Sequence, residues 1–126
     1  MITVYHNPKC RKSRAGLEYL TSRNIPVQVI EYLKHPLNRE LLKDLLMRLN
    51  MKPHDIVRTQ EDIYKEQFKG KAFNDDEWIT ILLENPKLIQ RPIMVKGPKA
   101  IIGQDADEIE KLLVKFDTFE ENNSLT

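Results

Sequence analysis

Short apolar runs alternate with longer amphipathic stretches along this chain, and the alternation divides it into strands and helices. Residues 2–5 and 27–30 are compact apolar runs typical of strands, and residues 12–23 between them carry apolar positions at helical spacing. Strand, helix and strand in this order predict a βαβ unit, in which the two strands run parallel and the helix packs on the sheet.

The middle of the chain has the pattern of helices. Leucines recur on one apolar stripe within residues 41–49, after Asn38, a residue suited to the N-cap of a helix. Asn74 with Glu77 makes a capping-box start for a later helix, which Asn85-Pro86 ends. The buried face of that later helix is expected to comprise Trp78, Ile79, Leu82 and Leu83.

The end of the chain returns to strands. Residues 92–95 and 100–102 are short apolar runs separated by a Gly97-Pro98 turn, which predicts an antiparallel hairpin. A final helix is expected to carry an apolar face of Ile109, Leu112, Leu113 and Phe116. The order of elements predicts an α/β fold with a four-stranded mixed sheet flanked by helices, and a thioredoxin-like sheet with a helical insertion satisfies that order.

Length and composition bound this picture. The 126 residues suit one domain, which we assign to residues 1–116, with the helical insertion at about 36–85 and a polar tail at 117–126. No apolar stretch approaches the ~20 residues of a membrane span and no signal peptide is visible, so we expect a cytoplasmic protein with no membrane partner. The net charge of +1 argues against a nucleic-acid partner, and a monomer is the default expectation.

The chemistry of the chain centres on its only cysteine, Cys10, which lies between the first apolar run and the first helical stretch. Four basic residues crowd around it: Lys9, Arg11, Lys12 and Arg14. A helix N-terminus and nearby cations both favour an anion, so we expect a reactive thiolate and a cradle for an oxyanion. The alternative interpretation of a single cysteine is a small buried hydrophobe. One cysteine and three histidines in no ligand spacing predict no metal site.

Three blocks of the sequence, in order, resemble the arsenate reductase family. They read His6-Asn7-Pro8-x-Cys10-x-x-Ser13-Arg14, Ile56-Val57-Arg58 and Asn85-Pro86-x-Leu88-Ile89-x-Arg91-Pro92-Ile93. The resemblance extends from Ile2 to about Leu113. The wider family includes glutathione-dependent arsenate reductases and Spx-type transcription regulators, and its members share a thioredoxin fold with a helical insertion.

The resemblance implies a reaction in which Cys10 attacks arsenate, expels water and forms a thiol–arsenate adduct. No bound cofactor is implied; glutathione would be the co-substrate and glutaredoxin the partner that complete the reduction to arsenite. Because the chain has no second cysteine, the electrons must come from outside it. His6 and Ser13 match family positions that tune the cysteine, and a plain helix cap is the alternative role for Ser13.

The resemblance also implies the oxyanion ligands. Arg58 and Arg91 correspond to family arginines whose planar guanidinium offers two parallel N–H donors, and Arg14 is a further candidate from the basic cluster. Family reductases carry a third arginine near the final hairpin, where this chain offers only Lys99 as a point donor. Pro92 corresponds to the cis-proline of thioredoxin folds.

Three interpretations of function stay open at this point. The first is a thiol oxidoreductase of the arsenate reductase type. The second is an Spx-like regulator that docks on RNA polymerase without catalysis, although Ser13 stands where the redox-sensing regulators carry the second cysteine of Cys-x-x-Cys. The third is a thiol enzyme that acts on another oxyanion or on a glutathione adduct.

Overall fold

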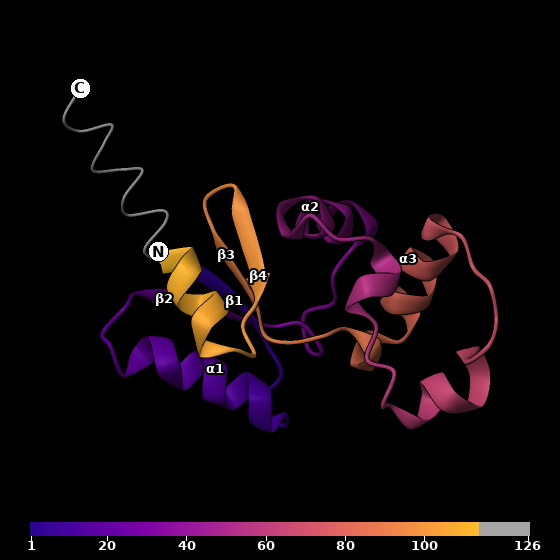
Figure 1. Cartoon of the computed structure of the whole chain (residues 1–126), viewed down its shortest axis with the longest axis horizontal. Coiled ribbons are helices and arrows are strands. Elements are labelled where there is room, and N and C mark those ends of the chain that lie inside the picture. Colours follow the sequence, from indigo (N-terminus) through magenta and orange to yellow (C-terminus); the bar gives the residue numbers. More distant parts are fainter. Residues whose placement is uncertain (114–126) are drawn as a thin grey trace. The chain divides into compact units, whose positions relative to one another are not determined.

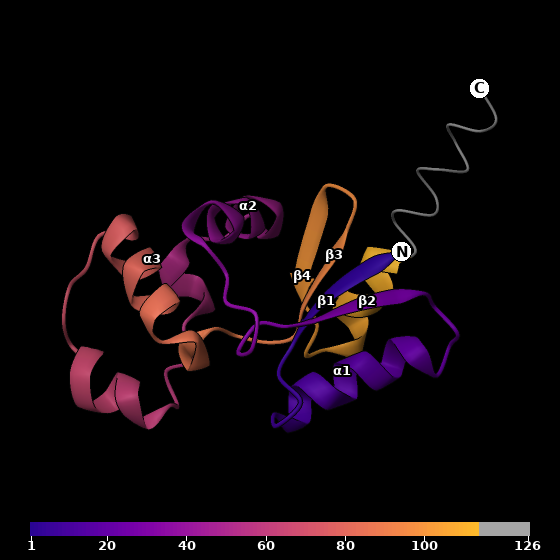
Figure 2. The same ribbon diagram turned by 180° about the vertical axis from the view of Figure 1, so that it is seen from behind.

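In the computed structural model, which describes residues 1–113, four strands form one mixed sheet in the order β2-β1-β3-β4 (Figures 1 and 2). The strands are β1 (Ile2–His6), β2 (Val27–Glu31), β3 (Ile93–Lys96) and β4 (Lys99–Ile102). β1 and β3 are antiparallel, with Val4 opposite Met94, and β3 and β4 form an antiparallel hairpin. The predicted strands and their α/β arrangement are confirmed.

The hairpin closes at the Lys96–Lys99 pair, with Gly97 and Pro98 as the two turn residues. Gly97 has a φ of +57°, a backbone conformation that glycine adopts without steric cost. Because proline cannot take a positive φ, this pair suits a two-residue turn in which only the first central residue is left-handed. The predicted Gly-Pro turn is confirmed.

Two helical segments pack on one face of the sheet: α1 (Arg11–Thr21) and residues 106–113. Side chains from both segments and from the strands form one buried cluster of Ile2, Val4, Leu20, Met94, Ile109, Leu112 and Leu113. Ile2 and Val4 point to the same face because side chains alternate along a strand. The apolar faces predicted for these helices are confirmed up to Leu113, whereas Phe116 lies outside the described residues.

Close packing ties α1 to the chain that follows β4. A Cβ atom placed on Gly16 would lie 2.5 Å from the Gly103 carbonyl oxygen and 2.9 Å from Cγ of Pro92. Glycine at position 16 therefore lets the middle of α1 approach this backbone. At the surface, Tyr19 and Arg23 both bind the Glu110 carboxylate and so join α1 to the last helical segment.

Within the described residues, Glu31–Gln90 form a second unit, while Met1–Ile30 and residues 91–113 form the first. The second unit comprises α2 (Arg39–Leu49), η1 (Pro53–Ile56), η2 (Tyr64–Phe68), α3 (Asp75–Glu84) and η3 (Pro86–Leu88). α2 and α3 pack against each other, and α3 also packs against η1 and η3. The domain limits 1–116, the insertion at about 36–85 and the tail 117–126 stay predictions, and the tail lies outside the described residues.

Both predicted helix starts in the second unit are confirmed. The Asn38 side chain accepts a hydrogen bond from the Leu41 backbone N–H at 2.8 Å. The Asn74 side chain accepts from the Glu77 N–H at 2.8 Å, and the Glu77 carboxylate accepts from the Asn74 N–H at 2.9 Å. These caps satisfy N–H groups that have no partner within the helix, and each cap contributes about 1 kcal/mol to stability.

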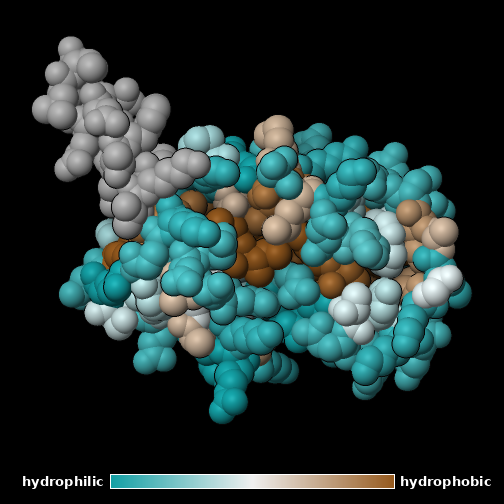
Figure 3. Space-filling view, in the orientation of Figure 1, coloured by the Kyte–Doolittle hydropathy of each residue, from teal (hydrophilic) through white to brown (hydrophobic). Residues whose placement is uncertain are grey.

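Polar side chains cover most of the face seen in Figure 3. Within residues 1–113, the large apolar side chains that are exposed are few, namely Met1, Val29, Met47 and Met51. None of the helices in this part of the chain is both long and apolar enough to cross a membrane.

Candidate active site

Cys10 is the N-cap residue of α1 and has an extended backbone conformation just before the first helical turn. Its N–H donates to the Asn7 carbonyl at 3.0 Å, and its carbonyl accepts from the Arg14 N–H at 3.0 Å. The residue is partly exposed. The structure therefore confirms a thiol at a helix N-terminus, where unpaired backbone N–H groups favour an anion.

Opposing effects set the ionisation of this thiol. Burial by itself raises the Cys10 pKa. A hydrogen bond from the Ser13 backbone N–H, the hydrogen bond and positive charge of Arg91, and the Lys12 backbone N–H all lower it. The lowering effects prevail, so the pKa of Cys10 lies below its ordinary value. A larger share of the thiol is ionised at neutral pH than in a free cysteine, and the thiolate is the nucleophilic form.

Arg91 lies two residues before β3 and is only 6% exposed. Its guanidinium binds the Cys10 thiol by hydrogen bond and by charge. The peptide bond from Arg91 to Pro92 is cis, as the resemblance implied. The fold thus brings together a cysteine and an arginine that are far apart in the sequence, and each belongs to the first unit.

Ser13 lies in the first turn of α1, fully buried, and its hydroxyl holds the loop that precedes the helix. Ser13 Oγ accepts a hydrogen bond from the Asn7 N–H at 3.0 Å and lies 2.7 Å from His6 Nδ1. One lone pair of Ser13 Oγ accepts the Asn7 N–H. The hydroxyl proton is then available, and it can be donated to Nδ1 of His6 when that imidazole is neutral. Cys10 and not Ser13 is the N-cap, so the Ser13 side chain organises the loop while its backbone N–H acts on the thiol.

Two further side chains stabilise the same loop. Asn7 Oδ1 accepts from the Lys9 N–H at 3.0 Å, and Arg14 Nη1 donates to the Pro8 carbonyl at 2.9 Å. Arg14 is exposed and contributes to the shape of the loop through this bond. Its role as a ligand for substrate stays a prediction.

Arg58 lies in the second unit, beside the antiparallel bridge between Val57 and Ile89. Its backbone N–H donates to the Leu88 carbonyl at 2.7 Å, so the second and third sequence blocks meet here. The Arg58 side chain is 12% exposed, and its Nε lies 3.3 Å from Glu61 Oε1. The role of Arg58 as an oxyanion ligand stays a prediction, and its pairing with Glu61 was not anticipated from the sequence.

Lys99 lies at the wrong end of the sheet for the role predicted for it. Thr3 pairs with Val95 and Lys96 pairs with Lys99, so Lys99 lies level with the start of β1. The end of β1 that leads to Cys10 is four residues further on, about 13 Å along the strand. Figures 1 and 2 show the hairpin turn and the start of α1 at opposite ends of the first unit. Lys99 is therefore removed from the set of oxyanion ligands.

Gln104 is a residue of the site that reasoning from the sequence missed. It follows β4 and donates from Nε2 to the Arg91 carbonyl at 2.7 Å. The preceding residue, Gly103, donates from its backbone N–H to the Pro92 carbonyl at 2.8 Å. The sequence held one usable signal, because an antiparallel hairpin turning at 97–98 brings residues 103–104 beside residues 91–92.

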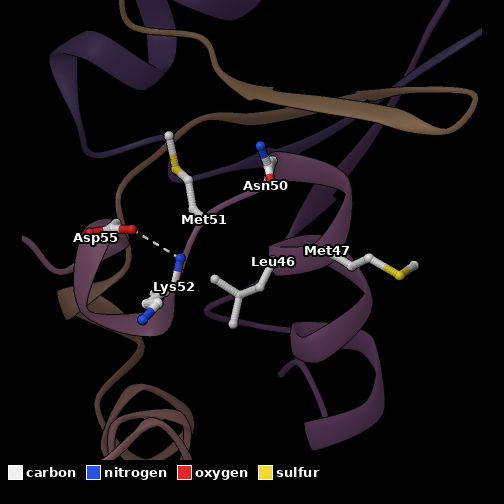
Figure 4. A pocket seen from close by; sticks show the side chains of 6 residues that line it. All are labelled: Leu46, Met47, Asn50, Met51, Lys52 and Asp55. Carbon is white, nitrogen blue, oxygen red and sulfur yellow. Dashed lines mark hydrogen bonds between the residues drawn. The ribbon is translucent and has the colours of Figure 1, made fainter.

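An open hollow of about 480 Å³ lies on the second unit (Figure 4). It is lined by Leu46, Met47, Asn50, Met51, Lys52 and Asp55. The Asp55 carboxylate accepts from the Lys52 backbone N–H at 2.9 Å and so caps η1. The lining contains neither Cys10 nor any of the residues predicted to bind an oxyanion. Among residues 1–113, no cluster of three or more His, Cys, Asp or Glu side chains could hold a metal ion.

Comparison with known families decides the identity of this fold. The model of the ArsC family matches residues 5–112. The chain belongs to the ArsC family. An arsenate reductase of Neisseria meningitidis is 33% identical over 114 residues, which cover 89% of this chain and 97% of that protein. A protein of Escherichia coli that carries the name uncharacterized protein YfgD is 34% identical, covering 89% of this chain and 96% of that protein.

The solved structures agree with the ArsC assignment. The structure of an arsenate reductase from Vibrio cholerae superposes with a TM-score of 0.81 and 37% identity, covering 87% of this chain and 95% of that one. The thioredoxin-like fold expected from the sequence is thereby confirmed. The family membership supports an arsenate-reductase-like thiol oxidoreductase, and the one cysteine in the chain is Cys10.

Proposed function

We propose that this ArsC protein reduces arsenate to arsenite in the cytoplasm, with Cys10 as the nucleophile and with glutathione and glutaredoxin as the source of electrons. One observation carries the proposal: the Cys10 thiol at the N-terminus of α1 is bound by the buried Arg91 and has a lowered pKa. The same donors that favour a thiolate also attract an oxyanion substrate.

The first step forms a bond between sulfur and arsenic. The Cys10 thiolate attacks arsenic(V), and one As–O bond breaks as its oxygen leaves as water after protonation. The backbone N–H groups of Lys12 and Ser13 and the guanidinium of Arg91 are the donors available to the remaining arsenate oxygens. Because these donors are already in place before the reaction, no free energy is spent on reorienting them when charge develops on those oxygens.

The second step moves two electrons. A glutathione thiolate attacks the Cys10 sulfur, the S–As bond breaks with its electron pair on arsenic, and arsenite leaves. Cys10 is left as a mixed disulfide with glutathione, which glutaredoxin and a second glutathione return to the thiolate. The chain has no other cysteine, so the resolving thiol has to be external. The net change is one arsenate and two glutathiones converted to arsenite, water and glutathione disulfide.

His6 and Arg58 are assigned supporting roles in this proposal. His6 is bound to Ser13 and helps to hold the loop before Cys10. Arg58 is offered as a second guanidinium for the oxyanion, on the strength of its sequence block alone. A regulator that acts by docking on RNA polymerase has less support, because Cys10 and Arg91 form the contact that a nucleophile needs.

The test is arsenate-dependent NADPH consumption in an assay with glutathione, glutaredoxin and glutathione reductase. We expect turnover with the natural chain and none with Cys10→Ser, which keeps the shape of the site without the nucleophile. No turnover from the natural chain, with glutaredoxin shown to be active on a standard disulfide, would refute arsenate reduction. Capture of the RNA polymerase α subunit by that inactive protein would then favour the regulator.

A further inference from the structure

We propose that Gln104 is a positioning residue that holds Arg91 at the Cys10 thiol by binding the Arg91 carbonyl. The bond runs from Gln104 Nε2 to the Arg91 carbonyl oxygen, is partly buried, and measures 2.7 Å. The inference deepens the proposed function, because it rests on Arg91 and Cys10 being the reactive pair.

Two consecutive residues after β4 bind two consecutive carbonyls before β3. Ile93 and Ile102 are the last pair of the β3–β4 ladder. Beyond them, the backbone N–H of Gly103 binds the Pro92 carbonyl at 2.8 Å, and the next carbonyl, that of Arg91, is bound by a side chain. The side-chain amide of Gln104 therefore adds one more hydrogen bond beyond the end of the β3–β4 ladder. This bond fixes the backbone of Arg91, whose guanidinium binds the thiol.

The backbone that carries Gln104 is itself fixed by packing. A Cβ atom on Gly103 would lie 2.6 Å from both Sδ and Cε of the fully buried Met94. The Gly103 carbonyl oxygen would lie 2.5 Å from a Cβ on Gly16 of α1. Gly103 is thus wedged between β3 and α1, and α1 is the helix whose N-terminus holds Cys10. Gln104 therefore links Arg91 to backbone that packs directly against α1, the helix that also positions the Cys10 thiol.

This link matters because the action of Arg91 on Cys10 depends steeply on distance. The guanidinium acts on the thiol through a hydrogen bond and through charge. A hydrogen bond weakens steeply when its donor turns out of line with the acceptor, the attraction between charges falls with distance, and reactive groups need neighbours that hold them in place. Without the Gln104 bond, the Arg91 backbone loses an anchor directly at its own carbonyl.

The experiment measures the rate at which iodoacetamide alkylates Cys10 as a function of pH, in a chain where no other cysteine can react. Gln104→Met removes the amide and nearly preserves size. We expect the midpoint of the alkylation profile to rise by about 0.5–1 pH unit, because the thiolate is held less firmly. Arg91→Met removes the guanidinium itself and is expected to raise the midpoint further.

The double variant decides between a positioning and a purely structural role. If Gln104 acts through Arg91, adding Gln104→Met to Arg91→Met leaves the midpoint where Arg91→Met alone puts it. Additive shifts in the double variant would overturn the proposal. An unchanged midpoint in the single variant Gln104→Met would overturn it as well. Gln104→Asn, whose shorter amide cannot reach the carbonyl, is the second variant should Gln104→Met fail to fold.

A matched control comes from the second unit, where Asn85 Nδ2 donates to the Ile81 carbonyl at 3.0 Å. Asn85→Leu removes the same kind of amide-to-carbonyl bond, and we expect it to leave the alkylation midpoint unchanged. The assay contains neither arsenate nor glutathione. A failure of this inference is therefore separate from a failure of the proposed arsenate reduction.

Discussion

Replacing Ser13 with alanine removes one hydroxyl, and with it a hydrogen bond from each of two buried groups, the Asn7 backbone N–H and His6 Nδ1. Ser13 is fully buried, and its Oγ serves both the Asn7 backbone N–H at 3.0 Å and His6 Nδ1 at 2.7 Å. Asn7 and His6 are themselves only 4% and 6% exposed, so water does not readily take the place of the hydroxyl. A buried polar group that loses its partner costs roughly 1–3 kcal/mol, and two groups are affected, so Ser13→Ala is expected to lower the free energy of unfolding by about 2–6 kcal/mol.

Urea unfolding of the two proteins measures this difference, read from the midpoints at a common slope. Ser22→Ala is the control, because Ser22 lies at the other end of α1, is exposed, and its Oγ donates to the Tyr19 carbonyl at 3.3 Å. We expect the control to change stability by less than about 0.5 kcal/mol. Equal costs for the two variants would refute the reasoning that the Ser13 hydroxyl is the internal anchor of the loop.

Two further changes test the packing and charge of the first unit. Gly16→Ala places a Cβ 2.5 Å from the Gly103 carbonyl oxygen, and we expect a net loss of about 1–2 kcal/mol in a urea titration despite the helix preference of alanine; a gain in stability would contradict the close approach. The pKa of Glu110 is lowered by the hydrogen bond from Tyr19 and by the Arg23 guanidinium. The carboxylate therefore contributes stability above its unfolded pKa and loses it as pH falls through its lower folded pKa, so the difference between the natural chain and Glu110→Gln should shrink from about pH 6 to about pH 3. A difference that stays constant over that range would contradict the pairing.

The parts of the fold that the sequence predicted correctly depend on local patterns. The strands around residues 2–5 and 27–30, the Asn38 cap and the Gly97-Pro98 turn are each encoded by residue types within a few positions. The position of Cys10 at a helix N-terminus is of the same kind, because it requires only a strand followed by a helix. Local chemistry and periodicity suffice for such features.

The site residues that were predicted wrongly or missed depend on strand register, which decides at which end of the sheet a residue lies. Lys99 carries the charge expected of a ligand near the final hairpin, but the register places it level with Ile2 and away from Cys10. Gln104 has a neutral amide that carries no catalytic signature in the sequence, although the same register brings it to Arg91. The pairing of Arg58 with Glu61 is a contact between side chains that periodicity does not encode.

The most direct test of the account is the rate at which iodoacetamide alkylates Cys10 at neutral pH, with and without arsenate and with sodium chloride added to match the ionic strength. A lowered thiol pKa and an oxyanion cradle at the same helix N-terminus predict fast alkylation that arsenate slows in a saturable way. Alkylation at the rate of an ordinary thiol, unchanged by arsenate, would contradict the claim that Cys10 and Arg91 form a reactive oxyanion site.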